Sequence, residues 1–199
     1  MFYPVSKVND YPWDLFYDSR TASIRELAPA IASATGAERI EEHVKGQWEL
    51  AILRRSVSGY ETPISIRLRG APMTNIAHVL NQDWSYKHSY ITHYGAVCLW
   101  PRLSSRRQMR EYKPVYPVVT FPEVRCVVPE VVQGLTVIQS NSSSDCIDIK
   151  TTSASSVEVI AFSIPGSSMA PSQCDEMIRS HVIAVSRDSV KYVGNTQGV

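Results

Sequence analysis

Apolar and polar residues alternate most regularly in the N-terminal half of the chain. Over residues 64–69, isoleucine or leucine at every second position alternates with serine or arginine, and residues 46–53 show a similar pattern. A period of two is typical of a strand with one buried face. Because a Ser-Gly turn at 58–59 lies between the two stretches, the pattern predicts a β-hairpin.

Other stretches have helical spacing. Ser23 and Glu26 form a capping-box pattern, apolar residues follow three and four apart, and Gly36 supplies a stop signal. A second apolar stripe follows the predicted strand directly, over residues 74–84. A third, short helix is expected over 172–178. The sequence therefore predicts helices between strands.

The remaining apolar runs are short and rich in β-branched and aromatic residues, which favour strands. Strands are predicted over 89–100, 115–121, 124–128, 135–140, 146–151 and 157–164, with a closing hairpin over 182–193.

The composition of the 199-residue chain agrees with a folded protein, since 44% of residues are apolar and 20% charged. No internal repeat or long linker divides it. We therefore expect an α+β fold: a single strand-rich domain over residues 21–199, with mostly antiparallel sheets, two or three short helices and an extended N-terminal arm over residues 1–20.

The arm is rich in aromatic residues between positions 2 and 17 and contains two prolines, with neither a helical nor a strand period. Because it is costly to leave so many aromatic side chains in water together, the arm is expected to dock on a protein surface. Its own domain and a neighbouring subunit are both candidate surfaces.

The net charge is only +1, so the chain as a whole does not attract nucleic acid or anionic lipid. One local cluster does carry positive charge, within a segment bounded by prolines over residues 101–117. Its basic residues are Arg102, Arg106, Arg107, Arg110 and Lys113. The cluster predicts an exposed, mobile basic loop that binds RNA, anionic lipid or an acidic protein surface, although a solvated loop with internal salt bridges is the alternative.

Sequence motifs of catalysis are missing. The chain has no glycine-flanked nucleophile, phosphate-binding glycine loop, CxxC or HExxH. His88 and His93 lie five apart in a predicted strand and would point to opposite faces. The four widely spaced cysteines fit small apolar residues of a reduced protein. We therefore expect no enzyme, with no catalytic residue, metal site or cofactor.

The first residues, Met1 to Pro4, lack the pattern of a signal peptide, and no apolar run is long enough to span a bilayer. We expect cytoplasmic synthesis without secretion, and at most peripheral contact with a membrane.

The order of the predicted elements resembles the globular domain of rhabdovirus matrix proteins over about residues 46–193. The stretch ISIRLRGAPMTNIAHVLNQDW, followed by SYITHYGAVCLW, is similar to a strand, helix and strand of that family. CDEMIRSHVIAVSRDSVKYV resembles its closing helix and two strands.

The resemblance implies a viral structural protein that forms homo-oligomers and links the nucleocapsid to the inner face of a membrane in the virion. It also implies that an N-terminal segment docks on a neighbouring subunit, here through Tyr11, Pro12, Trp13 and Phe16. Residues 1–18 lack the lysine-rich tail and PPxY motif of animal members. The basic loop would then have to supply the charge, and a plant-infecting member fits better.

Two other interpretations remain. A nucleic-acid-binding viral accessory protein, such as a silencing suppressor or movement factor, would bind RNA through the basic loop. A small capsid protein commonly carries a long basic tail for RNA, which this sequence lacks.

Overall fold

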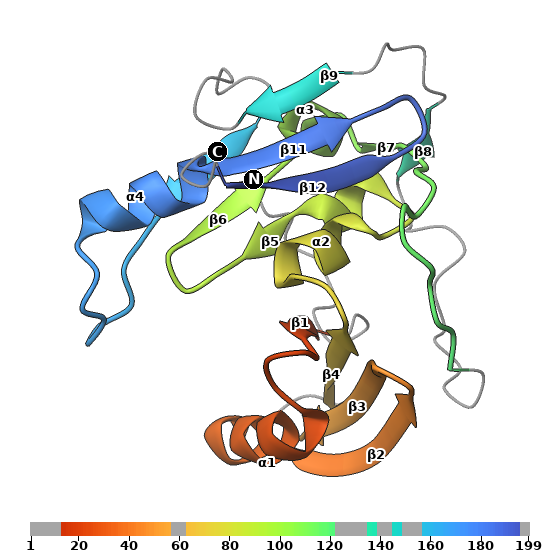
Figure 1. The fold of residues 1–199 in the computed structure, drawn as a ribbon, viewed down its shortest axis with the longest axis vertical. Coiled ribbons are helices and arrows are strands. Elements are labelled where there is room, and N and C mark those ends of the chain that lie inside the picture. Colours follow the sequence, from red (N-terminus) through yellow and green to blue (C-terminus); the bar gives the residue numbers. More distant parts are fainter. Residues whose placement is uncertain (1–12, 57–62, 122–134, 139–144, 149–156, 196–199) are drawn as a thin grey trace. The chain divides into compact units, whose positions relative to one another are not determined.

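The computed structural model describes residues 13–56, 63–121, 135–138, 145–148 and 157–195. They belong to two compact units (Figure 1). The N-terminal unit draws on residues 2–78 and 119–125, and the C-terminal unit on residues 79–118 and 126–199.

A four-stranded sheet forms the N-terminal unit. Its order is β1 (Trp13–Asp18), β4 (Ile64–Ala71), β3 (Trp48–Arg55) and β2 (Glu38–Lys45). Strands β2, β3 and β4 are antiparallel neighbours, so the hairpin predicted from the alternation is confirmed. Strand β1 pairs in parallel with β4 of the same chain, with Leu15 opposite Leu68.

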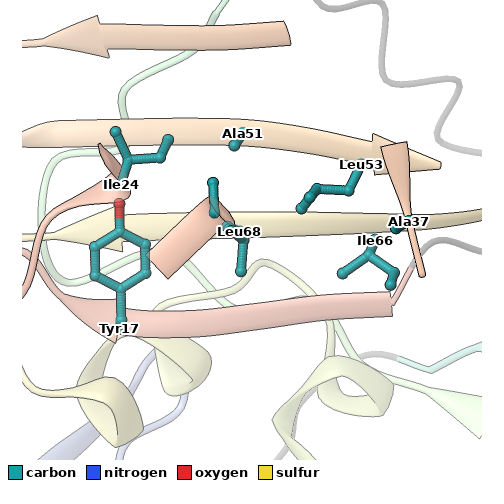
Figure 2. Close-up of a cluster of buried hydrophobic side chains, with 8 residues drawn as sticks. Tyr17, Ile24, Ala37, Ala51, Leu53, Ile66 and Leu68 are labelled. Atoms are coloured by element: carbon teal, nitrogen blue, oxygen red, sulfur yellow. The ribbon is translucent and has the colours of Figure 1, made fainter. Parts of the chain in front are cut away.

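Helix α1 (Ile24–Thr35) packs on one face of this sheet. Its N-terminus has the predicted capping box between Ser23 and Glu26, and Gly36 ends it with φ +67°, a conformation that favours glycine. The core beneath it, seen in Figure 2, consists of Tyr17, Ile24, Ala28, Ala37, Ala51, Leu53, Ile66 and Leu68.

Tyr17 connects three elements of this unit. Its hydroxyl donates to Glu49 Oε2 at 2.5 Å, and the same oxygen accepts the N–H of Ile24 at 2.9 Å, at the start of α1. A Cβ at Gly70 would lie 2.5 Å from Cζ of Tyr17. The glycine therefore makes room for the ring.

Charged residues lie on the other face of the sheet. Asp14 is paired across the strands with Arg67 and accepts from its Nε at 2.8 Å and its Nη2 at 2.6 Å, in a fork. Arg69 Nε donates to the same carboxylate at 2.7 Å. These contacts fix β1 on β4.

The C-terminal unit contains two three-stranded antiparallel sheets. One has the order β10 (Glu158–Ala161), β6 (Gly95–Cys98), β5 (Tyr90–Ile91). The other has the order β12 (Val190–Asn195), β11 (His181–Val185), β9 (Asp145–Asp148). Helix α4 (Pro171–Arg179) packs on β10 and β6.

Buried His181 links these two sheets. Its Nδ1 is hydrogen-bonded to the Tyr90 hydroxyl at 2.8 Å and its Nε2 to the Tyr94 hydroxyl at 3.2 Å. The Tyr192 ring from β12 also meets it edge-on. Burial lowers the pKa of His181 to about 4, so the imidazole is neutral near pH 7.

The predicted strand-rich α+β class with mostly antiparallel sheets is confirmed. The described residues contain four α-helices, one more than the upper expectation. The fourth is α3 (Pro101–Ser105), inside the segment predicted to be a loop. Treating residues 21–199 as one domain stays a prediction.

Other differences have local causes. Residues 13–18 of the predicted arm form β1. Helix α2 (Asn75–Leu80) ends before 84, and a 3-10 turn, η2 (Ser85–His88), follows. No strand forms over 115–121, where Pro117 removes a backbone donor. The strand predicted over 124–128 lies outside the described residues.

Candidate anion-binding surface

The predicted basic loop begins with a short helix. Pro101 stands in the first turn of α3, where its missing N–H costs nothing. At the other end Arg106 caps the helix, and its N–H donates to the Arg102 carbonyl at 3.3 Å. This turn places Arg102 and Arg106 close together along one short element.

Arg107 follows the helix in the left-handed region, with φ +52°. Among the described residues it is the only non-glycine residue with positive φ. Glycine is usual directly after a helix in this conformation, because a Cβ makes it unfavourable. The chain therefore carries a long cationic side chain where the backbone favours none.

Strand β7 (Gln108–Met109) continues the segment and pairs in parallel with β8 (Thr136–Val137). The Arg107 carbonyl accepts the Thr136 N–H at 2.8 Å, and Met109 is buried. The backbone on both sides of Arg107 is thus held by hydrogen bonds.

Residues 81–85 anchor the second half of the segment. Ser85 exchanges two hydrogen bonds with the backbone of Arg110, each 2.9 Å long, and the Tyr112 N–H donates to the Asp83 carbonyl at 2.7 Å. The Asn81 side chain holds both backbone groups of Tyr116, at 2.8 and 3.1 Å. The segment expected to be a loop over 101–117 therefore contains helix α3 and strand β7, and polar groups outside it satisfy part of its backbone.

Three of the predicted site residues project from this support into solvent. Arg102, Arg106 and Arg107 are exposed, and no carboxylate of the described residues forms an ion pair with any of them. Arg67 and Arg69, by contrast, are paired with Asp14. Guanidinium groups of this kind are suited to binding phosphate or carboxylate oxygens in a fork.

The other two predicted residues have different surroundings. Arg110 is half-buried and its Nη1 donates to the Tyr112 hydroxyl at 3.5 Å, so its charge is partly used within the protein. Lys113 is exposed, and its backbone N–H donates to the Asp188 carbonyl at 2.5 Å. We therefore define the cationic surface as Arg102, Arg106 and Arg107.

A group of three packed rings, with Tyr112 and His88 buried and Trp100 half-buried, adjoins the cationic surface. The indole of Trp100, directly before α3, stacks on the Tyr112 ring with centroids 5.6 Å apart and planes 16° apart. His88 lies against both rings, with its centroid 6.5 Å from that of Trp100 and 5.3 Å from that of Tyr112. The three residues are far apart in sequence and share no period, so sequence reasoning missed them.

Hydrogen bonds define the proton position on His88. The Trp100 indole N–H can only donate, and it lies 3.2 Å from His88 Nδ1, so Nδ1 accepts. Nε2 therefore carries the proton and donates to the Gln82 carbonyl at 3.0 Å. Burial lowers the pKa of His88 to about 4, and the ring is neutral near pH 7.

The residues expected to mediate self-association are placed only in part. Trp13 is 58% exposed on β1, whereas the Phe16 ring packs edge-on against His78 with centroids 4.7 Å apart. Tyr11 and Pro12 lie outside the described residues. The described part of the arm therefore docks on its own chain and leaves Trp13 accessible.

Within the described ranges, no group of three or more His, Cys, Asp or Glu side chains is arranged to hold a metal ion. In the same part of the chain, no helix has the length and apolar character needed to cross a membrane. Comparison with family models, with characterised proteins and with solved structures found no match to the chain.

Proposed function

We propose that this chain is a structural protein of the matrix type that binds a phosphate-rich partner through Arg102, Arg106 and Arg107. The observation that carries the proposal is the exposure of three arginines that no described carboxylate pairs with, on a segment whose backbone is hydrogen-bonded on both sides of Arg107. The resemblance of the sequence pattern to rhabdovirus matrix proteins supports the structural role.

The preferred partner is RNA of a nucleocapsid. Guanidinium forks match phosphodiester oxygens, and three contacts on a fixed support lose less side-chain and backbone freedom on binding. Three arginines next to an anionic membrane would contribute only about 3 kcal/mol. Leu103 in α3 and Met109 in β7, next to the three arginines, are half-buried and buried, so neither is presented for insertion into lipid.

Self-association is the second part of the proposal. Trp13 is a large apolar side chain in an edge strand, and its exposed fraction of 58% leaves most of it available to a second copy. Tryptophan is enriched among residues that dominate binding energy at protein interfaces. We expect Trp13 to contribute to this contact, together with Phe16, which lies on the opposite face of β1 against His78.

The test compares two variants that lose equal charge. Changing Arg102, Arg106 and Arg107 to Gln removes the cationic surface, while changing Arg25, Arg54 and Arg55 to Gln removes three exposed arginines of the N-terminal unit. RNA affinity is measured by fluorescence anisotropy with a labelled single-stranded RNA of about 20 nucleotides. The affinity should fall at least about tenfold in the first variant and stay unchanged in the second. The wild-type slope of log affinity on log salt should be about −2.

Light scattering and liposome flotation complete the experiment. Wild-type protein should form oligomers as its concentration rises, and Trp13→Ser should shift this association to higher concentration. Equal RNA affinity in both arginine variants would contradict the proposed role of the cationic surface in RNA binding. RNA binding by a protein that stays monomeric would favour the nucleic-acid-binding accessory protein, and flotation lost with the three arginines would identify the membrane as the partner.

A further inference from the structure

His88 contacts the residues that flank the segment carrying the cationic surface, and it is fully enclosed. Its exposed fraction is 0%. Trp100, which it contacts, is the residue before α3, and Tyr112 follows β7, so the histidine touches both ends of the segment that carries Arg102, Arg106 and Arg107. A change at His88 therefore acts on the support of all three arginines.

The hydrogen bonds of His88 require the neutral ring. Nδ1 must remain without a proton to accept from the Trp100 indole, because Nε2 already donates to the Gln82 carbonyl. A proton on Nδ1 would turn this contact into two N–H groups facing each other at 3.2 Å. The protonated ring cannot keep the Trp100 contact in this geometry.

Charged groups around His88 do not remove this conflict. Asp83 lies nearby, but its carboxylate is already paired with Lys87 at 2.6 Å, and the two have opposite effects on the pKa of His88. The Arg110 guanidinium donates a hydrogen bond to the Tyr112 hydroxyl. Glu111, which bridges to Trp84 through the backbone, has an exposed side chain.

We propose that His88 makes the cationic surface sensitive to acid: protonation of its Nδ1 displaces Trp100, loosens the α3–β7 segment and releases the phosphate-rich partner. The inference rests on the proposed function for the release of the partner, but the displacement of Trp100 stands without it. The expected direction, weaker RNA binding in acid, is informative because general electrostatics predicts stronger binding in acid. Acid protonates carboxylates and makes the protein more cationic, which should strengthen binding to RNA.

The size of the effect follows from linkage. Burial lowers the pKa of His88 from 6.5 to about 4, and the opened segment should return it to its ordinary value. Between about pH 7 and pH 5 the ratio of opened to closed segment should then rise about twentyfold.

The first measurement needs no ligand. Hydrogen exchange of the Tyr112 and Ser85 amides, corrected for intrinsic rates, should report an opening ratio that rises about twentyfold over this pH range in the wild type. In His88→Gln, whose amide can accept from Trp100 and donate to Gln82 without titrating, the rise should be less than about threefold. His93→Gln, which replaces an exposed histidine, is the matched control and should behave as the wild type.

The second measurement is RNA affinity against pH. Wild-type protein should release the labelled RNA at a higher pH than His88→Gln. Trp100→Phe keeps the ring on Tyr112 but removes the N–H, so it should also lower the pH of release, and it tests the idea if His88→Gln does not fold. Identical exchange profiles in wild type and both variants would overturn the proposal, as would RNA affinity that rises on acidification. Altered exchange in a protein that binds no RNA would refute the proposed function and leave the acid response of His88 standing.

Discussion

At Arg107, the backbone conformation favours glycine, whereas the proposed binding of RNA requires the arginine side chain. A non-glycine residue in the left-handed region costs roughly 1–2 kcal/mol, and part of this is recovered when glycine replaces it, since glycine itself loses more freedom on folding. We expect Arg107→Gly to raise the free energy of unfolding by up to about 1 kcal/mol, or to leave it unchanged, while it lowers RNA affinity. Urea unfolding and fluorescence anisotropy measure the two effects.

The matched control lies one residue earlier. Arg106 has φ −90°, where glycine relieves no strain, so Arg106→Gly should lose affinity and stability together. If both substitutions destabilise the protein equally, the left-handed conformation of Arg107 carries no strain that glycine can relieve.

At the scale of single residues, the basic cluster was predicted from the sequence, but not which of its residues are exposed and which are half-buried. Charge and flanking prolines are visible in the sequence and indicated an exposed segment. The half-burial of Arg110 depends on Tyr112 and on hydrogen bonds to Ser85, which is 25 residues away. Contacts of this kind follow from tertiary packing and have no local signal.

Among the elements, the contact between β4 and β1 depends on the absence of a side chain at position 70. Gly70→Ala would place a Cβ 2.5 Å from the Tyr17 ring, and because Tyr17 and the first turn of α1 share Glu49, the ring cannot move freely. We expect a loss of about 1–3 kcal/mol in the free energy of unfolding. Thermal or urea unfolding measures it.

A double-mutant cycle checks the cause. Tyr17→Ala removes the ring, so Gly70→Ala should cost much less in that background than in the wild type. Equal costs in both backgrounds would show that the close approach of the ring to position 70 does not constrain the sheet.

Elements with a clean period were predicted well, and those without one were not. The β3–β4 hairpin and α1 have regular apolar spacing and capping residues, and both are present. Strand β2 has the sequence ERIEEHVK, which is too polar to indicate a strand, and it forms because the edge of β3 satisfies its backbone. Strand β1 also lacks a regular alternation of apolar and polar residues, and it too forms because a neighbouring strand, here β4, satisfies its backbone.

The whole molecule should lose stability in mild acid. His78 in the N-terminal unit and His88 and His181 in the C-terminal unit each have a pKa lowered by burial to about 4. Such histidines bind protons on unfolding, so their contribution to stability is complete above about pH 6.5 and is lost as the pH falls toward about 4. Each should cost about 2 kcal/mol between about pH 7 and pH 5.

Urea unfolding at several pH values tests this expectation. His181→Gln should flatten the dependence of the unfolding free energy on pH, whereas His93→Gln should leave its slope unchanged. A wild-type unfolding free energy that stays constant between about pH 7 and pH 5 would contradict the neutral, buried state of all three histidines.

The parallel pairing of β1 with β4 also sets an order of events during synthesis. Trp13 leaves the ribosome before its partner Ile66, and the antiparallel strands β2, β3 and β4 can pair with near neighbours in sequence while β1 must wait. Until β4 is made, Trp13, Leu15 and Phe16 have no strand partner. Asp14 lies between two of these apolar residues and Asp18 follows them, and we expect the two charges to oppose aggregation of the nascent segment until Asp14 reaches Arg67.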